Sequence, residues 1–78
     1  MTTDELATKL AESGIPSFAY SLTGGLPNEA YCLEIANGTW QVYYSERGHK
    51  NDIMSFASER EACDHLYKII RAGYGIPN

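Results

Sequence analysis

"YCLEIANGTWQVYY", residues 31–44, carries the strongest structural signal of the chain. Its centre, Asn37-Gly38, tolerates the positive φ angles of a type I′ turn, and a run of alternating apolar and polar residues lies on each side. A two-residue loop brings three apolar pairs onto one face of a hairpin: Ile35 with Trp40, Leu33 with Val42, and Tyr31 with Tyr44. A slip of one residue would bring Trp40 opposite Glu34, so the apolar pattern determines the register.

The other face of this hairpin is mixed in character. Glu34 lies opposite Gln41, and Cys32 lies opposite Tyr43, which makes the face too polar for a second core. We therefore expect this face to be solvated or covered by a partner. Because Trp40 and Tyr44 belong to the core face, Tyr43 is the aromatic side chain that we expect to be exposed.

Two capping boxes predict the starts of two helices. Thr2-x-x-Glu5 begins a first helix that Gly14 and Pro16 end, and Ser58-Glu59-Arg60-Glu61 begins a second. The second helix carries an apolar stripe at helical spacing, formed by Ala62, Leu66, Ile69, Ile70 and Gly73. We expect this stripe to pack on the sheet.

Shorter signals fill the rest of the chain. Residues 17–22 alternate and predict a strand with Phe18, Tyr20 and Leu22 on one face, and residues 53–57 predict another short strand. The predicted fold is a single α+β domain over residues 1–78, with 73–78 as a tail. Its two layers contain an N-terminal helix, a three- to four-stranded antiparallel meander and a C-terminal helix.

Charge and composition narrow the classes of partner. Ten acidic and six basic residues give a net charge of −4, which repels phosphate backbones and disfavours direct nucleic-acid binding. The same charge suits a basic protein partner, although solubility alone also accounts for it. The N-terminus has no signal-peptide pattern, and no segment approaches the roughly 18 apolar residues of a membrane span. We expect a cytoplasmic protein that does not bind a membrane.

The cysteines and histidines do not form a catalytic pattern. Cys63 and His65 are two positions apart on a predicted helix, so they point in different directions, and Cys32 lies within a strand. Two distant cysteines fit neither a disulfide framework nor a zinc site. We therefore expect packed, reduced thiols, with no catalytic residues, no metal and no cofactor, and a cysteine-dependent enzyme is the least favoured class.

The run from Glu46 to Asp52 has two interpretations. It is either a polar hairpin loop in which Gly48 supplies an unusual backbone angle, or an interaction surface beside Tyr43 formed by Glu46, Arg47 and Asp52. Arginine can bind a carboxylate through two hydrogen bonds, which makes Arg47 an orienting contact in the second interpretation.

Residues 39–66, TWQVYYSERGHKNDIMSFASEREACDHL, contain an aromatic strand that ends in Tyr-Ser-Glu-Arg-Gly, followed by Phe-x-Ser-Glu-x-Glu-Ala-Cys. This pattern resembles small immunity proteins encoded beside bacterial polymorphic or contact-dependent growth-inhibition toxins. The resemblance covers residues 38–71. It implies a protein without enzymatic activity that binds one cognate toxin C-terminal domain, often a nuclease, in the cytoplasm of the producing cell.

The leading hypothesis is therefore an immunity protein that neutralises a toxin by stoichiometric binding. In this hypothesis exposed carboxylates meet basic groups of the toxin, Tyr43 fills a pocket of the toxin, and Arg47 fixes the orientation. The predicted partner-binding residues are Glu34, Tyr43, Glu46, Arg47 and Asp52. The alternative is a small adaptor or regulatory domain that binds another protein through a free sheet face or an edge strand.

Overall fold

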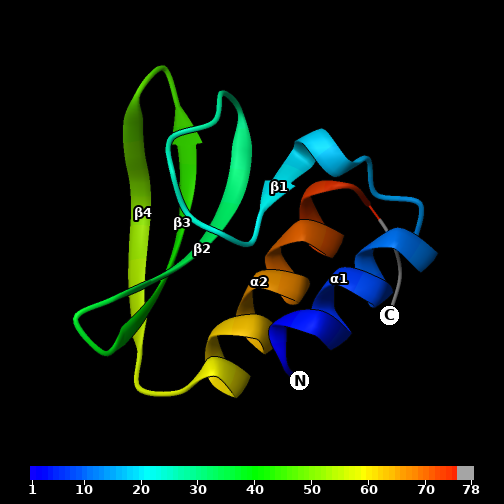
Figure 1. Cartoon of the computed structure of the whole chain (residues 1–78). Helices are drawn as coiled ribbons and strands as arrows, with labels where there is room; N and C mark the ends of the chain where they lie inside the picture. Colours follow the sequence, from blue (N-terminus) through cyan, green and yellow to red (C-terminus); the bar gives the residue numbers. More distant parts are fainter. Residues whose placement is uncertain (76–78) are drawn as a thin grey trace.

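A four-stranded sheet forms one layer of the computed structural model, and two helices form the other (Figure 1). The model describes residues 1–75. Its elements in chain order are α1 (Thr3–Glu12), the 3₁₀ turn η1 (Ser17–Ala19), β1 (Tyr20–Ser21), β2 (Ala30–Ala36), β3 (Thr39–Glu46), β4 (His49–Phe56) and α2 (Glu59–Gly73). The predicted α+β fold class is confirmed, and the sheet is mostly antiparallel, with strand order β1-β2-β3-β4.

The hairpin of β2 and β3 has the predicted register. Its turn residues Asn37 and Gly38 have φ angles of 52° and 76°, as a type I′ turn requires. Tyr31 pairs with Tyr44, Leu33 with Val42, and Ile35 with Trp40. The periodicity of the apolar residues was therefore sufficient to place these two strands.

A second tight turn replaces most of the loop expected at residues 46–52. Arg47 and Gly48 have φ angles of 52° and 76°, so two residues connect β3 to β4, and β4 begins at His49. The polar residues at the start of β4 gave no strand signal, because pairing with β3 and not apolar periodicity holds them extended. The angle expected at Gly48 is confirmed.

β4 contains a β-bulge in front of Tyr43. Val42 pairs with Met54 and Tyr44 pairs with Asn51, which leaves Asp52 and Ile53 facing Tyr43 alone. Asp52 takes a φ angle of 54°, in the left-handed region that Asp tolerates better than most residues. Asp52 is thus a bulge residue within a strand and not a loop residue as predicted.

The two helices lie side by side (Figure 1), and hydrogen bonds link their N-terminal ends. The predicted capping box of α1 is present, with Thr2 and Glu5 exchanging hydrogen bonds. Glu59, in the first turn of α2, accepts hydrogen bonds from the backbone N–H and the hydroxyl of Thr3 at 2.9 and 2.7 Å. Its carboxylate therefore satisfies a free donor at the positive end of α1.

The stripe predicted on α2 packs over the sheet. Ala62, Leu66 and Ile70 are buried in one cluster with Leu6 and Leu10 of α1 and Leu33 and Val42 of the sheet. Gly73 is the last helical residue, so the expected tail begins later, and residues 76–78 of that prediction lie outside the described residues. A Cβ atom at Gly73 would lie 2.5 Å from the hydroxyl of Tyr31, which shows how closely the end of α2 approaches β2.

The segment after α1 differs from its prediction. Residues 17–19 form a 3₁₀ turn, because the carbonyl of Pro16 accepts a hydrogen bond from Ala19 N–H, and only Tyr20 and Ser21 are extended. Phe18, predicted to share a face with Tyr20 and Leu22, is 79% exposed. β1 pairs with β2 in parallel, which makes the sheet mixed at this edge.

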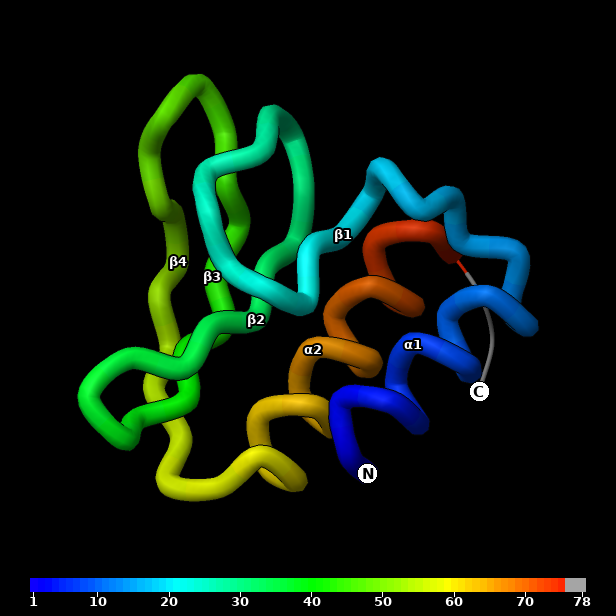
Figure 2. The backbone as a smooth tube through the Cα atoms, viewed as in Figure 1, coloured from blue at the N-terminus to red at the C-terminus, as the bar shows by residue number. Residues whose placement is uncertain are grey.

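The chain covers the second face of the sheet with its own residues 22–29, which Figure 2 traces along β2 and β3. The hydroxyl of Tyr43 donates a 2.7 Å hydrogen bond to the carbonyl of Gly25, and Ala30, Cys32 and Ser45 are buried on this face. Gly24 has a φ angle of 78° and lies against Glu34, so a Cβ there would meet the carboxylate at 2.5 Å. The expectation of a solvated or partner-covered face is therefore wrong for these residues.

Candidate functional site

Tyr43 is not a surface residue. Its side chain is 1% exposed, and the Nζ of Lys50 lies 4.7 Å from the centre of its ring. Burial raises the pKa of Tyr43 to about 12, because the ionised phenolate would lose its hydration. The prediction that Tyr43 is exposed and fills a pocket of a partner is therefore wrong, and the residue instead packs beneath residues 22–29.

Glu34 forms an ion pair within the chain. Its Oε2 lies 2.9 Å from the Nζ of Lys50, and this hydrogen bond holds the pKa of Glu34 below its ordinary value. Lys50 thus lies between a carboxylate and the face of the Tyr43 ring. A basic partner would have to displace Lys50 to reach Glu34, which makes Glu34 a weak candidate for first contact.

The other three predicted residues lie at the turn and at the bulge. Arg47 is exposed, and its backbone N–H donates to Oδ1 of Asn28 at 3.2 Å, while Asp52 is exposed on β4. Glu46 follows Ser45, which is on the covered face, so Glu46 belongs to the opposite, helix-side face. Glu34 and Glu46 therefore do not share one surface.

Both cysteines are fully buried. Burial raises the pKa of the Cys32 and Cys63 thiols, because the thiolate would lose its hydration. The imidazole of His65 lies against the ring of Phe56, with ring centres 5.1 Å apart and the ring planes inclined by 40°. Neither thiol has the exposure and low pKa that a nucleophile needs. Within residues 1–75, no three His, Cys, Asp or Glu side chains are grouped as a metal site would require.

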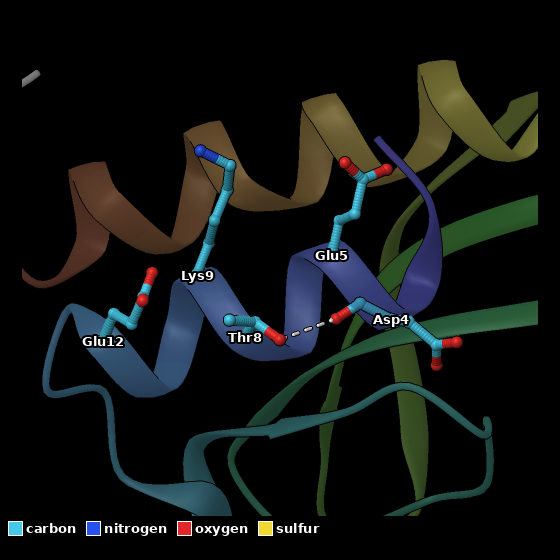
Figure 3. A pocket seen from close by; sticks show the side chains of 5 residues that line it. All are labelled: Asp4, Glu5, Thr8, Lys9 and Glu12. Carbon is cyan, nitrogen blue, oxygen red and sulfur yellow. Dashed lines mark hydrogen bonds between the residues drawn. The ribbon is translucent and has the colours of Figure 1, made fainter.

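An open depression runs along the solvent face of α1 (Figure 3). It is lined by Asp4, Glu5, Thr8, Lys9 and Glu12. The hydroxyl of Thr8 donates to the carbonyl of Asp4 at 3.2 Å, and Thr2 holds the pKa of Glu5 below its ordinary value through the capping hydrogen bonds. All the lining groups come from one helix, so none converge from opposite walls on a bound molecule.

A group of aromatic and acidic residues lies on the helix-side face near the end of α2. We call it the tyrosine patch, and its members are Tyr31, Tyr44, Tyr74, Glu29 and Glu46. The rings of Tyr31 and Tyr44 meet edge to face with centres 5.0 Å apart, and Tyr74 is 45% exposed. Burial raises the pKa of Tyr44, and the nearby carboxylates of Glu29 and Glu46 raise it further.

Only part of this patch was accessible to sequence reasoning. Tyr31 and Tyr44 were assigned to the core face, and both are only partly buried. The register predicted from the apolar pairs already places Glu29 and Glu46 across from each other at the end of the ladder, because it pairs Ala30 with Ser45. Tyr74 follows the last residue of α2 and had no periodic signal.

β4 forms the second surface feature, since it is the edge strand of the sheet. Seven of its eight residues are exposed, among them Ile53 at 50% and Met54 at 47%. An edge strand presents unpaired backbone N–H and C=O groups to any extended segment of another chain. Apolar side chains beside that edge add area that a partner could bury.

Compared with known proteins, the chain matches no protein-family model, no curated protein and no solved structure. The functional assignment therefore depends on the chain's own chemistry. None of the helices in residues 1–75 combines the length and the apolar character needed to cross a membrane.

Proposed function

We propose that this protein is an immunity protein, which binds the C-terminal domain of one cognate bacterial toxin and neutralises it by stoichiometric inhibition. The observation that carries the proposal is the open edge of β4, with its row of exposed residues from His49 to Ser55. The site of action in this proposal is the cytoplasm of the producing cell, where the toxin domain would otherwise reach its substrate.

The edge of β4 supports protein binding for a physical reason. Backbone hydrogen bonds to an edge strand contribute affinity, and alternate side chains contribute specificity. The bulge at Asp52 and Ile53 interrupts the pairing pattern, so the regular segment open to a partner is Met54–Phe56.

The net charge of −4 supports a basic partner. Complementary charge increases the rate of association, and a toxin that acts on nucleic acid carries a basic cleft which an acidic protein can occupy. The resemblance of residues 38–71 to immunity proteins is consistent with this class of partner. The buried thiols, with their raised pKa values, favour a binding role over a cysteine-dependent enzyme.

The direct test uses the gene next to the one that encodes this chain. Its C-terminal domain should arrest growth when produced alone, and production of the present chain in the same cells should restore growth. The two purified proteins should form a complex of equal stoichiometry. If the neighbouring domain is harmless or does not bind, the immunity proposal is refuted, and a non-toxic partner at equal stoichiometry would favour the adaptor alternative.

A variant locates the interface. Ile53→Lys places a positive charge beside the edge that should meet a basic partner, and we expect at least a tenfold loss of affinity. Phe18→Lys is the matched control, because Phe18 is also an exposed apolar residue but lies in η1, directly before β1, which forms the edge of the sheet opposite to β4. Equal effects of the two substitutions would contradict the assignment of β4 to the interface.

A further inference from the structure

The tyrosine patch contains a pair of like charges that the fold does not neutralise. Glu29 lies one residue before β2, and Glu46 ends β3, so the register sets them across from each other. Like charges opposite each other across a ladder are destabilising. Among residues 1–75, no lysine, arginine or histidine lies within ion-pair distance of either carboxylate.

Tyrosine rings lie beside these carboxylates. Tyr44 and Tyr31 pack edge to face at 5.0 Å, and Tyr74 remains 45% exposed next to the end of α2. The face of a tyrosine ring attracts a cation through its quadrupole. Carboxylates and ring faces together favour a positively charged group and offer no advantage to a neutral or negative one.

The opposite face of the sheet shows the same chemistry already satisfied. There the Nζ of Lys50 lies 2.9 Å from the carboxylate of Glu34 and 4.7 Å from the ring centre of Tyr43. The cation in that arrangement comes from the chain itself. In the tyrosine patch the carboxylates and rings are present, and no ion pair within residues 1–75 engages Glu29 or Glu46, although His49 lies opposite Glu46 in the β3–β4 ladder.

We propose that the tyrosine patch binds an arginine side chain of the protein partner, between the carboxylates of Glu29 and Glu46 and over the ring of Tyr44. This inference rests on the proposed function, because it names the group that the partner inserts. Arginine fits better than lysine, since its planar guanidinium stacks on a ring while donating two parallel hydrogen bonds to a carboxylate. A metal ion would require more ligands than two carboxylates supply.

The first experiment needs no partner protein. N-acetyl-arginine amide is titrated into the isotope-labelled protein, and the tyrosine ring resonances are followed by NMR. We expect shifts concentrated at Tyr31, Tyr44 and Tyr74 that weaken as salt is added. N-acetyl-citrulline amide, a neutral analogue of the same shape, should produce none of them. Equal shifts with both compounds, or shifts spread evenly over the surface, would overturn the inference.

Charge variants supply the matched control. Glu29→Gln with Glu46→Gln should reduce the affinity for the arginine compound at least fivefold. Asp4→Asn with Glu12→Gln also removes two carboxylates, but from the depression along α1 (Figure 3), and should leave the affinity unchanged. Equal losses in both double variants would show a general charge effect and refute the site.

The cognate domain separates the two proposals. If wild-type protein binds the toxin domain and the Glu29→Gln, Glu46→Gln variant binds at least tenfold more weakly, both proposals are supported. Unchanged affinity of that variant overturns the arginine site and leaves the immunity function standing. If the wild-type protein does not bind the domain, the function fails, and the arginine titration still decides whether the patch recognises a guanidinium. Unfolding temperatures no lower than that of wild type would exclude misfolding of the variant.

Discussion

Tyr43 connects the sheet to the segment that covers its second face, and Tyr43→Phe tests that connection. The substitution keeps the ring in place and removes the hydroxyl that donates to the carbonyl of Gly25 at 2.7 Å. A net hydrogen bond of this kind contributes about 1 kcal/mol to stability. For a domain of this size, that loss lowers the unfolding temperature by about 4–8 °C.

The effect should change sign at alkaline pH. Burial raises the folded-state pKa of Tyr43 to about 12, whereas the ordinary value in the unfolded chain is 10.0. Wild-type protein therefore keeps the full contribution of this hydroxyl below pH 10 and loses it as the pH rises towards 12, because the unfolded chain releases the proton first. At pH 11 this loss amounts to about 1 kcal/mol, and at pH 12 to about 2 kcal/mol. Phenylalanine has no proton to release, so the variant should equal wild type between about pH 10 and 11 and exceed it above that range.

Urea unfolding of both proteins, followed by far-UV circular dichroism at a series of pH values from 7 to 11.5, measures this difference. Tyr67→Phe is the control, because it also removes a tyrosine hydroxyl, but one that makes no hydrogen bond to residues 1–75, and we expect it to leave the stability at pH 7 nearly unchanged. The urea m-value should stay constant, which would show that the extent of unfolding is unchanged. A Tyr43→Phe difference that is near zero at pH 7, or that stays constant up to pH 11.5, would refute the assigned burial and hydrogen bond.

Three further outcomes follow from the same packing. Gly24→Ala and Gly14→Ala both place alanine at a positive φ angle, and each should lower the free energy of unfolding by about 1–2 kcal/mol. In urea unfolding Gly24→Ala should lose up to about 1 kcal/mol more, because its Cβ displaces the Glu34 carboxylate from its ion pair with Lys50. Equal losses in the two variants would contradict that contact. Hydrogen bonds from Thr3 hold the pKa of Glu59 below its ordinary 4.5, so wild-type stability should fall as the pH drops below about 4.5. The Glu59→Gln variant should be less stable than wild type at neutral pH and should lose part of this acid dependence. Parallel curves of unfolding temperature against pH for the two proteins would argue against the interaction. The thiols of Cys32 and Cys63 are fully buried and have raised pKa values. A disulfide reagent at neutral pH should therefore label them only as fast as the native protein unfolds, and immediately in urea. Rapid labelling without denaturant would disprove their burial.

Local chemistry was enough to predict much of the fold. Asn37-Gly38 and the alternating residues beside it determine the β2–β3 register, because a slip would expose the apolar side chains. Thr2 and Ser58 start the two helices through hydrogen bonds within a single turn. Signals of this kind need only neighbouring residues, so they can be read without the tertiary structure.

The candidate site was less predictable, because exposure depends on distant segments. Tyr43 was expected at the surface from the alternation of the strand alone, but residues 22–29 fold over it. This turn-rich segment has no periodic apolar pattern from which its packing on the sheet could be predicted. The strand character of His49–Asp52 was missed, since Arg47 takes the positive φ angle that favours glycine or asparagine. Two of the residues named from the sequence, Glu46 and Glu34, prove to lie on opposite faces.

The sequence by itself therefore determined the helix starts, the central hairpin and the face of the sheet that meets the helices, because each follows from capping groups or from apolar spacing between near neighbours. Only the tertiary structure decided that the chain covers its own second face, that Lys50 neutralises Glu34, and that Tyr74 at the end of α2 comes near Tyr44. These features depend on contacts between residues far apart in the chain. Burial and charge supply the free energy that stabilises such contacts, and neither requires a pattern among neighbouring residues that could be recognised in the sequence.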